Sequence, residues 1–308
     1  MPFETKAKIA TFGGHLLKLS HNSKTTQTPM NVSVYLPPAA LNPTNPQKVP
    51  VLIFLSGLTC TPDNCTEKGF LHAAASSHGI AIVYPDTSPR GAGIEGEDAA
   101  YDFGSGAGFY VDATRAPWDK NYNMYSYVTE ELPSLLFAEE EEEEEKEGGG
   151  AEDPLAGKLD GSRVSITGHS MGGHGALTLF LKNPGKYRSV SAFAPISNPS
   201  ACPWGEKAFS GYLGSGDGQK EGWKAHDATH LVASETWKGK EVNALIDVGT
   251  GDQFYKEGQL LPENFEKAVK EAGVTGVTVR YQEDYDHSYY FVSSFAKDHV
   301  DHAAKYLL

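Results

Sequence analysis

The sequence predicts an α/β fold in which a mainly parallel central sheet carries helices on both faces and an antiparallel hairpin forms the N-terminus. Two observations support this prediction. Apolar runs of strand length alternate with segments of helical periodicity along the 308 residues, as in a sheet built from β-α-β units. Ahead of them, residues 7–20 and 30–36 predict two strands, with alternating side chains along the second. We expect one domain spanning residues 1–308.

The remaining elements follow from their own residues. Unbroken apolar runs predict buried strands. Apolar residues at helical spacing predict helices, and Gly79 and Gly273 are expected to end two of them. The predicted strands are 49–55, 80–84, 163–167, 190–196, 242–248 and 274–281, and the predicted helices are 64–78, 124–138, 262–272 and 291–308.

Composition bounds the partners and the compartment. The net charge of −14 argues against nucleic acid, and no stretch approaches the roughly 20 apolar residues of a membrane span. Cys60, Cys65 and Cys202 cannot make an even disulfide framework, and Cys60 and Cys65 are too few for a structural zinc site. We therefore expect free thiols and no metal. Because the N-terminus lacks the apolar core of a signal peptide, the cytoplasm is the expected compartment.

Much of the negative charge lies in one segment. Glutamates run unbroken from Glu139 to Glu145, and three glycines follow at 148–150. Such a segment cannot bury apolar surface, so residues 139–150 are predicted to be a flexible, solvated insertion without a catalytic role. The alternative is an acidic docking segment for a basic partner.

The motif Gly168-His169-Ser170-Met171-Gly172 lies between a β-branched run and a helix of small residues. A strand, a G-x-S-x-G turn and a helix form the nucleophile elbow of an α/β-hydrolase, so Ser170 is the predicted nucleophile. The flanking glycines are expected because the elbow strains the backbone and leaves little room for side chains. A structural turn with an unreactive serine is the alternative.

The strand at 49–55 is followed by Ser56-Gly57-Leu58-Thr59-Cys60. In α/β-hydrolases the loop after this strand lends one backbone N–H to the oxyanion hole, and Leu58 is the predicted donor. An ordinary strand-to-helix loop is the alternative. Cys60 follows this loop, so its thiol either faces the substrate pocket or is buried and inert.

The fold requires an acid and then a histidine after the serine. Asp252 lies just past the end of the strand at 242–248, whereas Asp247 lies inside that strand and should point to a sheet face. Asp252 is therefore the predicted acid. His287 is the histidine after Asp252 that falls on a loop following a strand, and it is the predicted base. His299 and His302 are expected on the polar face of the closing helix.

Two segments are candidates to cover the site. Residues 85–118 form a long loop rich in glycine and aromatic residues, but they lack the glycine and lysine pattern of a nucleotide-binding loop. Residues 197–240 are irregular and contain Trp204, which either lines the substrate pocket or packs the insertion onto the body.

Taken together, these motifs resemble the S-formylglutathione hydrolase family, also called esterase D. The resemblance implies an enzyme without a cofactor that hydrolyses S-formylglutathione to glutathione and formate in formaldehyde detoxification, and that is often a homodimer. It also implies a triad of Ser170, Asp252 and His287, with the main-chain N–H groups of Leu58 and Met171 as oxyanion donors. The matching segments are 55–61, 101–114, 117–127, 131–133, 168–177 and 286–290.

Other functions stay open at this stage. A general carboxylesterase or an acyltransferase could use the same fold, and acceptance of an alcohol in place of water would identify the acyltransferase. A catalytically silent interaction protein that uses the acidic run is a further alternative, which an intact triad argues against.

Overall fold

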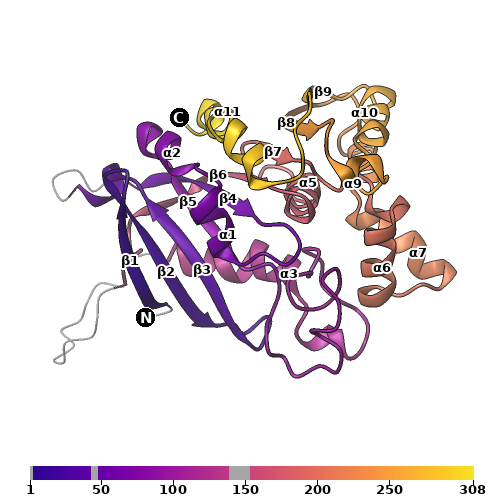
Figure 1. The fold of residues 1–308 in the computed structure, drawn as a ribbon, viewed down its shortest axis with the longest axis horizontal. Helices are drawn as coiled ribbons and strands as arrows, with labels where there is room; N and C mark the ends of the chain where they lie inside the picture. Colours follow the sequence, from indigo (N-terminus) through magenta and orange to yellow (C-terminus); the bar gives the residue numbers. More distant parts are fainter. Residues whose placement is uncertain (1–2, 43–47, 139–152) are drawn as a thin grey trace.

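The computed structural model describes residues 3–42, 48–138 and 153–308. The predicted insertion at 139–150 lies outside the described residues. Within them, nine strands form one sheet in the order β1-β2-β3-β5-β4-β6-β7-β8-β9 (Figure 1). The strands are β1 (Glu4–Thr11), β2 (Gly14–Asn22), β3 (Pro29–Leu36), β4 (Val49–Leu55), β5 (Ala81–Pro85), β6 (Leu159–Gly168), β7 (Val190–Phe193), β8 (Glu241–Gly249) and β9 (Thr275–Gln282).

The pairing of neighbouring strands changes once across the sheet, from antiparallel to parallel. β1, β2 and β3 pair antiparallel, and β3 pairs antiparallel with β5. From β5 across β4, β6, β7 and β8 to β9, all neighbours are parallel. The predicted α/β fold with a mainly parallel sheet is confirmed. Every residue of β4 is buried, as its unbroken apolar run indicated.

The N-terminal prediction was wrong in one respect. The strand expected over residues 7–20 is two strands, β1 and β2, so three antiparallel strands open the sheet. Phe12 (φ 47°) and Gly13 (φ 73°) form the two-residue turn between them, with the positive φ values that tight hairpins require. β1 is almost fully exposed, so no apolar alternation marked its boundary.

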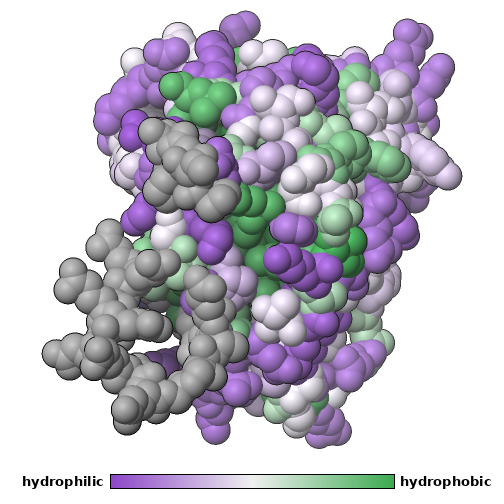
Figure 2. All heavy atoms as spheres, turned by 90° about the vertical axis from the view of Figure 1, so that its left-hand side faces the viewer, coloured by the Kyte–Doolittle hydropathy of each residue, from purple (hydrophilic) through white to green (hydrophobic). Residues whose placement is uncertain are grey.

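β1 forms one edge of the sheet, and most of the described surface on this face is hydrophilic (Figure 2). Glu4, Lys6 and Lys8 are exposed along it. Charged side chains on an edge strand oppose pairing with another chain, and here they protect the backbone groups that β1 leaves unpaired.

Helices cover the two faces of the sheet (Figure 1). On one face α11 contacts α1 and α2, and on the other α5 contacts α8, which contacts α10. The helices are α1 (Pro62–Lys68), α2 (His72–His78), α3 (Met124–Ser126), α4 (Leu132–Leu136), α5 (Met171–Lys182), α6 (Pro203–Tyr212), α7 (Asp217–Trp223), α8 (Ala228–Val232), α9 (Gln253–Lys256), α10 (Pro262–Glu271) and α11 (Tyr289–Leu307), with a short π-helix, η3 (Tyr127–Glu131), between α3 and α4.

One predicted helix and one segment predicted to be irregular differ from the structure. The helix expected over 64–78 is divided into α1 and α2, because Phe70 takes a left-handed conformation (φ 56°) between them. Gly79 ends α2 with φ 69°, as expected. Residues 197–240, expected to be irregular, contain α6, α7 and α8.

The prediction for His299 was also wrong. Its side chain is fully buried rather than on a polar face, and its ring stacks on Phe193 with centroids 3.5 Å apart. The polarity of histidine alone could not indicate this position, because the partner that accepts its hydrogen bond, Asp247, comes from β8.

None of the helices in the described parts of the chain is long and apolar enough to cross a membrane.

Candidate active site

Ser170 lies in a strained turn between β6 and α5. Its φ of 58° and ψ of −119° are unusual for a residue with a side chain and cost on the order of 1–3 kcal/mol. Its amide donates to the Phe193 carbonyl (2.9 Å), which helps to hold the turn. A Cβ at Gly168 would lie 2.2 Å from the Gly172 carbonyl oxygen, and one at Gly172 would lie 2.0 Å from that of Leu55. These contacts explain why the motif needs both glycines.

Asp252 and His287 meet at the carboxyl end of the sheet, from the segments after β8 and β9. His287 Nδ1 lies 2.5 Å from Asp252 Oδ2. The other carboxylate oxygen, Oδ1, accepts from the amides of Phe254 (2.8 Å) and Tyr255 (3.3 Å), so Asp252 also caps α9. An imidazole that donates its Nδ1 proton to Asp252 presents Nε2 as a proton acceptor.

Ser170 and His287 line the same cavity of about 290 Å³. Within the described residues no hydrogen bond joins the Ser170 hydroxyl to His287. Such bonds are often long in substrate-free active sites and tighten in the Michaelis complex. The cavity is lined by Gly57, Leu58, Thr59, Cys60, Tyr101, His169, Ser170, Trp204, Phe254, His287, Ser288 and Tyr289.

The amides of Leu58 and Met171 donate no hydrogen bond among residues 3–42, 48–138 and 153–308. Met171 is the first residue of α5, where a helix leaves its N–H groups without partners within the helix and carries partial positive charge. Next to Leu58, a Cβ on Gly57 would lie 3.1 Å from Ser170 Cβ. The backbone before Leu58 thus passes directly beside Ser170.

Cys60 and Trp204 both line this cavity. Burial raises the pKa of the Cys60 thiol, which keeps it protonated and weakens it as a nucleophile. Its Sγ lies 3.9 Å from the Tyr289 hydroxyl. The Trp204 indole N–H donates to the Tyr101 hydroxyl (3.1 Å), and its ring packs on Phe254.

Four lining residues with aromatic rings were assigned no role from the sequence: Tyr101, His169, Phe254 and Tyr289. Phe254 and Tyr289 follow Asp252 and His287 by two residues, a proximity that could have indicated them. The His169 ring packs on His287, with centroids 4.6 Å apart. Burial holds the pKa of His169 well below its usual value, so its ring stays neutral beside His287.

Asp247, the competing acid, lies away from this cavity. It accepts from Arg280 Nε (2.7 Å), His299 Nε2 (3.0 Å) and Gln282 Nε2 (2.9 Å) inside the fold. Burial would raise the pKa of Asp247, but the hydrogen bonds from His299 and Arg280 outweigh it and lower the pKa to about 2. Its position agrees with the prediction that a residue within β8 points to a sheet face.

Comparison with known proteins identifies the family. A family model described as "Putative esterase" matches residues 23–302. The S-formylglutathione hydrolase of Rattus norvegicus is 52% identical over 96% of this chain and 95% of its own length, and that of Arabidopsis thaliana is 47% identical over the same shares. The chain belongs to the S-formylglutathione hydrolase family.

A solved structure agrees with this assignment. An S-formylglutathione hydrolase from Agrobacterium tumefaciens superposes with a TM-score of 0.86 and 42% identity, covering 100% of both chains. Members of the family are serine esterases that act on thioesters, so the chain is a hydrolase of this class.

Proposed function

We propose that the protein hydrolyses S-formylglutathione to glutathione and formate, with Ser170 as nucleophile, His287 as base and Asp252 as the acid that orients it. The observation that carries the proposal is the hydrogen bond between Asp252 and His287 beside the cavity that Ser170 lines, in a chain 52% identical to a named S-formylglutathione hydrolase. The reaction would serve formaldehyde detoxification.

The chemistry proceeds in two halves. His287 Nε2 takes the Ser170 proton as Oγ attacks the formyl carbon, and the tetrahedral intermediate collapses when the carbon–sulfur bond breaks. The imidazolium returns its proton to the departing thiolate, which leaves as glutathione. A water that gives one proton to His287 then attacks the formyl carbon. His287 returns that proton to Ser170 Oγ as the ester bond breaks, which frees Ser170 and releases formic acid, which ionises to formate. Asp252 holds the imidazole tautomer and stabilises its cation. The cycle requires no cofactor.

The amides of Leu58 and Met171 would hold the oxyanion in both halves. Their lack of hydrogen-bond partners among the described residues supports this role. A donor of this kind contributes roughly 3 kcal/mol to lowering the barrier, because it is aimed in advance at charge that develops only in the transition state.

The cavity wall beside the proposed nucleophile is rich in aromatic rings. Aromatic rings of Tyr101, Trp204, Phe254 and Tyr289 surround the reacting groups, and the thiol of Cys60 adds a further apolar contact. We infer that Trp204 and Cys60 contact substrate through packing rather than through chemistry.

Ser170→Ala is the direct test. We expect kcat/KM for S-formylglutathione to fall by about 10⁴-fold or more, because only binding and oxyanion stabilisation remain. Ser189→Ala is the matched control, since Ser189 is also buried but hydrogen-bonds Ser165 away from the cavity (2.8 Å), and it should keep full activity. Substantial hydrolysis by purified, folded Ser170→Ala would remove Ser170 from its role.

Substrate preference separates this function from a general carboxylesterase. We expect kcat/KM to be higher for S-formylglutathione than for S-acetylglutathione and an aryl acetate. An alcohol acceptor that outcompetes water would instead identify an acyltransferase.

Leu58→Pro tests the first oxyanion donor. Leu58 follows Gly57 in a turn closed by the bond from the Cys60 amide to the Gly57 carbonyl (3.3 Å), and proline is favoured at this turn position. The substitution deletes the N–H, so kcat should fall by about 10²–10³ with KM little changed. An unchanged kcat would exclude Leu58 as a donor.

We further propose one domain over residues 1–308, a cytoplasmic location and a homodimer. The single sheet supports the first, and the three buried free cysteines support the second. The homodimer rests on the family resemblance, and light scattering on the purified protein tests it.

A further inference from the structure

The turn formed by residues 57–60, which carries the Leu58 amide, does not hold itself in place. Thr59 has a φ of 67°, a conformation that suits glycine and is unfavourable for a β-branched residue. The bond that closes the turn, from the Cys60 amide to the Gly57 carbonyl, is long at 3.3 Å. Contacts from outside the turn must therefore fix its geometry.

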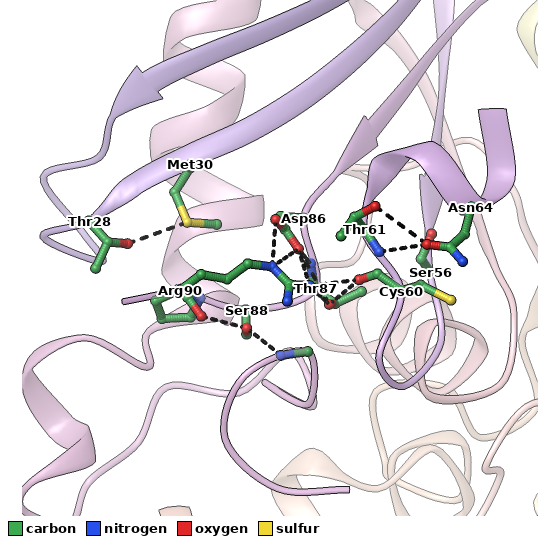
Figure 3. Close-up of polar contacts among 12 residues, drawn as sticks. Thr28, Met30, Ser56, Cys60, Thr61, Asn64, Asp86, Thr87, Ser88 and Arg90 are labelled. Atoms are coloured by element: carbon green, nitrogen blue, oxygen red, sulfur yellow. Dashed lines mark hydrogen bonds and ion pairs between the residues drawn. The ribbon is translucent and has the colours of Figure 1, made fainter. Parts of the chain in front are cut away.

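Those contacts come from the segment that follows β5. The Cys60 carbonyl accepts two hydrogen bonds, from Thr87 Oγ1 (2.7 Å) and from Arg90 Nη2 (3.0 Å) (Figure 3). Thr87 is fully buried. A buried hydroxyl and a guanidinium thus hold the end of the turn from one side.

Arg90 is itself fixed by Asp86. Arg90 Nε lies 3.0 Å from Asp86 Oδ2 and Nη2 lies 2.9 Å from Oδ1, a bidentate pair (Figure 3). The Asp86 side chain is only 2% exposed, and its Oδ1 also accepts from the Thr87 amide (2.7 Å). Because the guanidinium is planar, the pair with Asp86 sets the direction in which Nη2 meets the Cys60 carbonyl.

A second contact holds the middle of the turn. The Thr59 amide donates to the Gly106 carbonyl (2.9 Å), and the Gly106 amide donates to Ser88 Oγ (2.7 Å). Gly106 is required here, since a Cβ would lie 2.9 Å from Thr59 Cα. The long loop after β5 therefore hydrogen-bonds the turn at both Thr59 and Cys60.

We propose that Thr87 and Arg90, with Asp86 behind them, are positioning residues that aim the Leu58 amide at the oxyanion. This inference rests on the proposed function, because the direction of that amide matters to catalysis only if Ser170 attacks a carbonyl beside it. The effect belongs to the transition state, where the oxyanion forms, so loosening the turn lowers kcat and leaves KM nearly unchanged.

The test is a double-mutant cycle. Thr87→Val deletes the hydroxyl with little change in shape, and Arg90→Lys keeps the positive charge beside Asp86 while losing the planar fork. Each is made alone and together with Leu58→Pro, and kcat and KM for S-formylglutathione are measured per folded molecule. We expect each to lower kcat about tenfold alone and less than twofold in the Leu58→Pro background, since the amide that they aim is then absent.

Arg163→Lys is the matched control. Arg163 pairs with Asp160 (2.7 Å) and donates to the Lys48 carbonyl (3.0 Å), and its side chain is 35% exposed against 33% for Arg90. The two arginines thus hold carbonyls beyond opposite ends of β4. Arg163→Lys should change kcat less than twofold in both backgrounds.

The outcomes separate the two proposals. If Ser170→Ala retains activity, the proposed function is wrong and the positioning role falls with it. If Ser170→Ala is inactive but Thr87→Val and Arg90→Lys keep kcat within twofold, or lower it equally with and without Leu58→Pro, only the positioning role is wrong. A variant that only lowers the melting temperature, without a change in kcat, also contradicts it.

Discussion

Two aspartate–histidine pairs are built from the same region of the sheet, and they differ in what surrounds them. Asp252, just after β8, contacts Nδ1 of His287. The His287 side chain is 15% exposed and lines the cavity. Asp247, within β8, contacts Nε2 of His299, and both side chains are fully buried. Both pairs join a carboxylate to an imidazole, but His287 lines the cavity whereas His299 is buried inside the fold.

The comparison shows that the same two side-chain types form a hydrogen-bonded pair both beside a cavity and deep inside the fold. His287 lines the cavity, and its Nδ1 lies beside Asp252. The second nitrogen of His299 is buried without a partner among the described residues, and the Asp247 charge is already compensated by Arg280. We therefore expect the first pair to affect turnover and the second to affect stability.

The largest expected difference is in activity. Asp252→Asn should lower kcat by about 10⁴-fold, because the amide favours the wrong imidazole tautomer. Asp247→Asn should change kcat less than threefold per folded molecule. Steady-state kinetics on both variants with S-formylglutathione makes the comparison. If the two losses were similar, the assignment of the acid would be wrong.

The loss of folding stability at acidic pH should come mainly from buried histidines. Burial lowers the pKa of His72, His174 and His302 to about 4, and burial together with the charge of Lys182 lowers that of His226 to about 3. Below about pH 6.5 these histidines are protonated in the unfolded chain but stay neutral in the folded chain. Their contribution to the free energy of unfolding is thus fully present above pH 6.5 and is lost as the pH falls toward 4.

Each such group contributes a slope of about 1.4 kcal/mol per pH unit in that window. Urea unfolding at pH 7, 6 and 5 should show the free energy of unfolding decline. His72→Phe should reduce the slope of that decline by the contribution of one protonating group. An unfolding free energy that stays constant between pH 7 and 5 would contradict this prediction.

The third effect is on stability at neutral pH. Asp247→Asn removes the charge that accepts from Arg280 and His299, so the free energy of unfolding should fall by roughly 3 kcal/mol. Asp252→Asn, whose Oδ1 can still cap α9, should lose only about 1 kcal/mol. Chemical denaturation followed by circular dichroism measures both values, and the reverse order would overturn the structural role of Asp247.

The smallest effect concerns one neutral donor. Gln282→Leu deletes a single hydrogen bond to Asp247 (2.9 Å) and should lower stability by about 1 kcal/mol without changing kcat. Gln253→Leu is the control, since Gln253 bonds Glu257 at the surface (2.8 Å) and should change stability by less than about 0.5 kcal/mol. Equal losses would show that the burial of the acceptor Asp247 adds nothing to the hydrogen bond.

Much of the site could be predicted from the sequence because its chemistry depends on short-range rules. The glycines beside Ser170 mark a turn that nothing bulkier fits, and Asp252 and His287 each follow an apolar run. The family prediction, made from motifs spread along the chain, is confirmed by relatives of up to 52% identity. The catalytic roles of these residues stay predictions.

What could not be predicted depends on contacts between distant segments. The burial of His299 requires Asp247 from β8, and the aromatic wall of the cavity joins Tyr101 to Trp204. No apolar alternation marked the boundary between β1 and β2, since β1 is exposed on both faces, and the turn signal of Gly13-Gly14 was overlooked.

The sequence by itself determined the fold class, the family and the glycine-flanked turn at Ser170, because apolar periodicity and glycine sterics act over a few residues. Only the tertiary structure decided which histidine is buried and which lines the cavity, and what holds the turn at 57–60. Those outcomes depend on burial and on hydrogen-bond partners far away in the chain, such as Arg90 for Cys60, which no local pattern encodes.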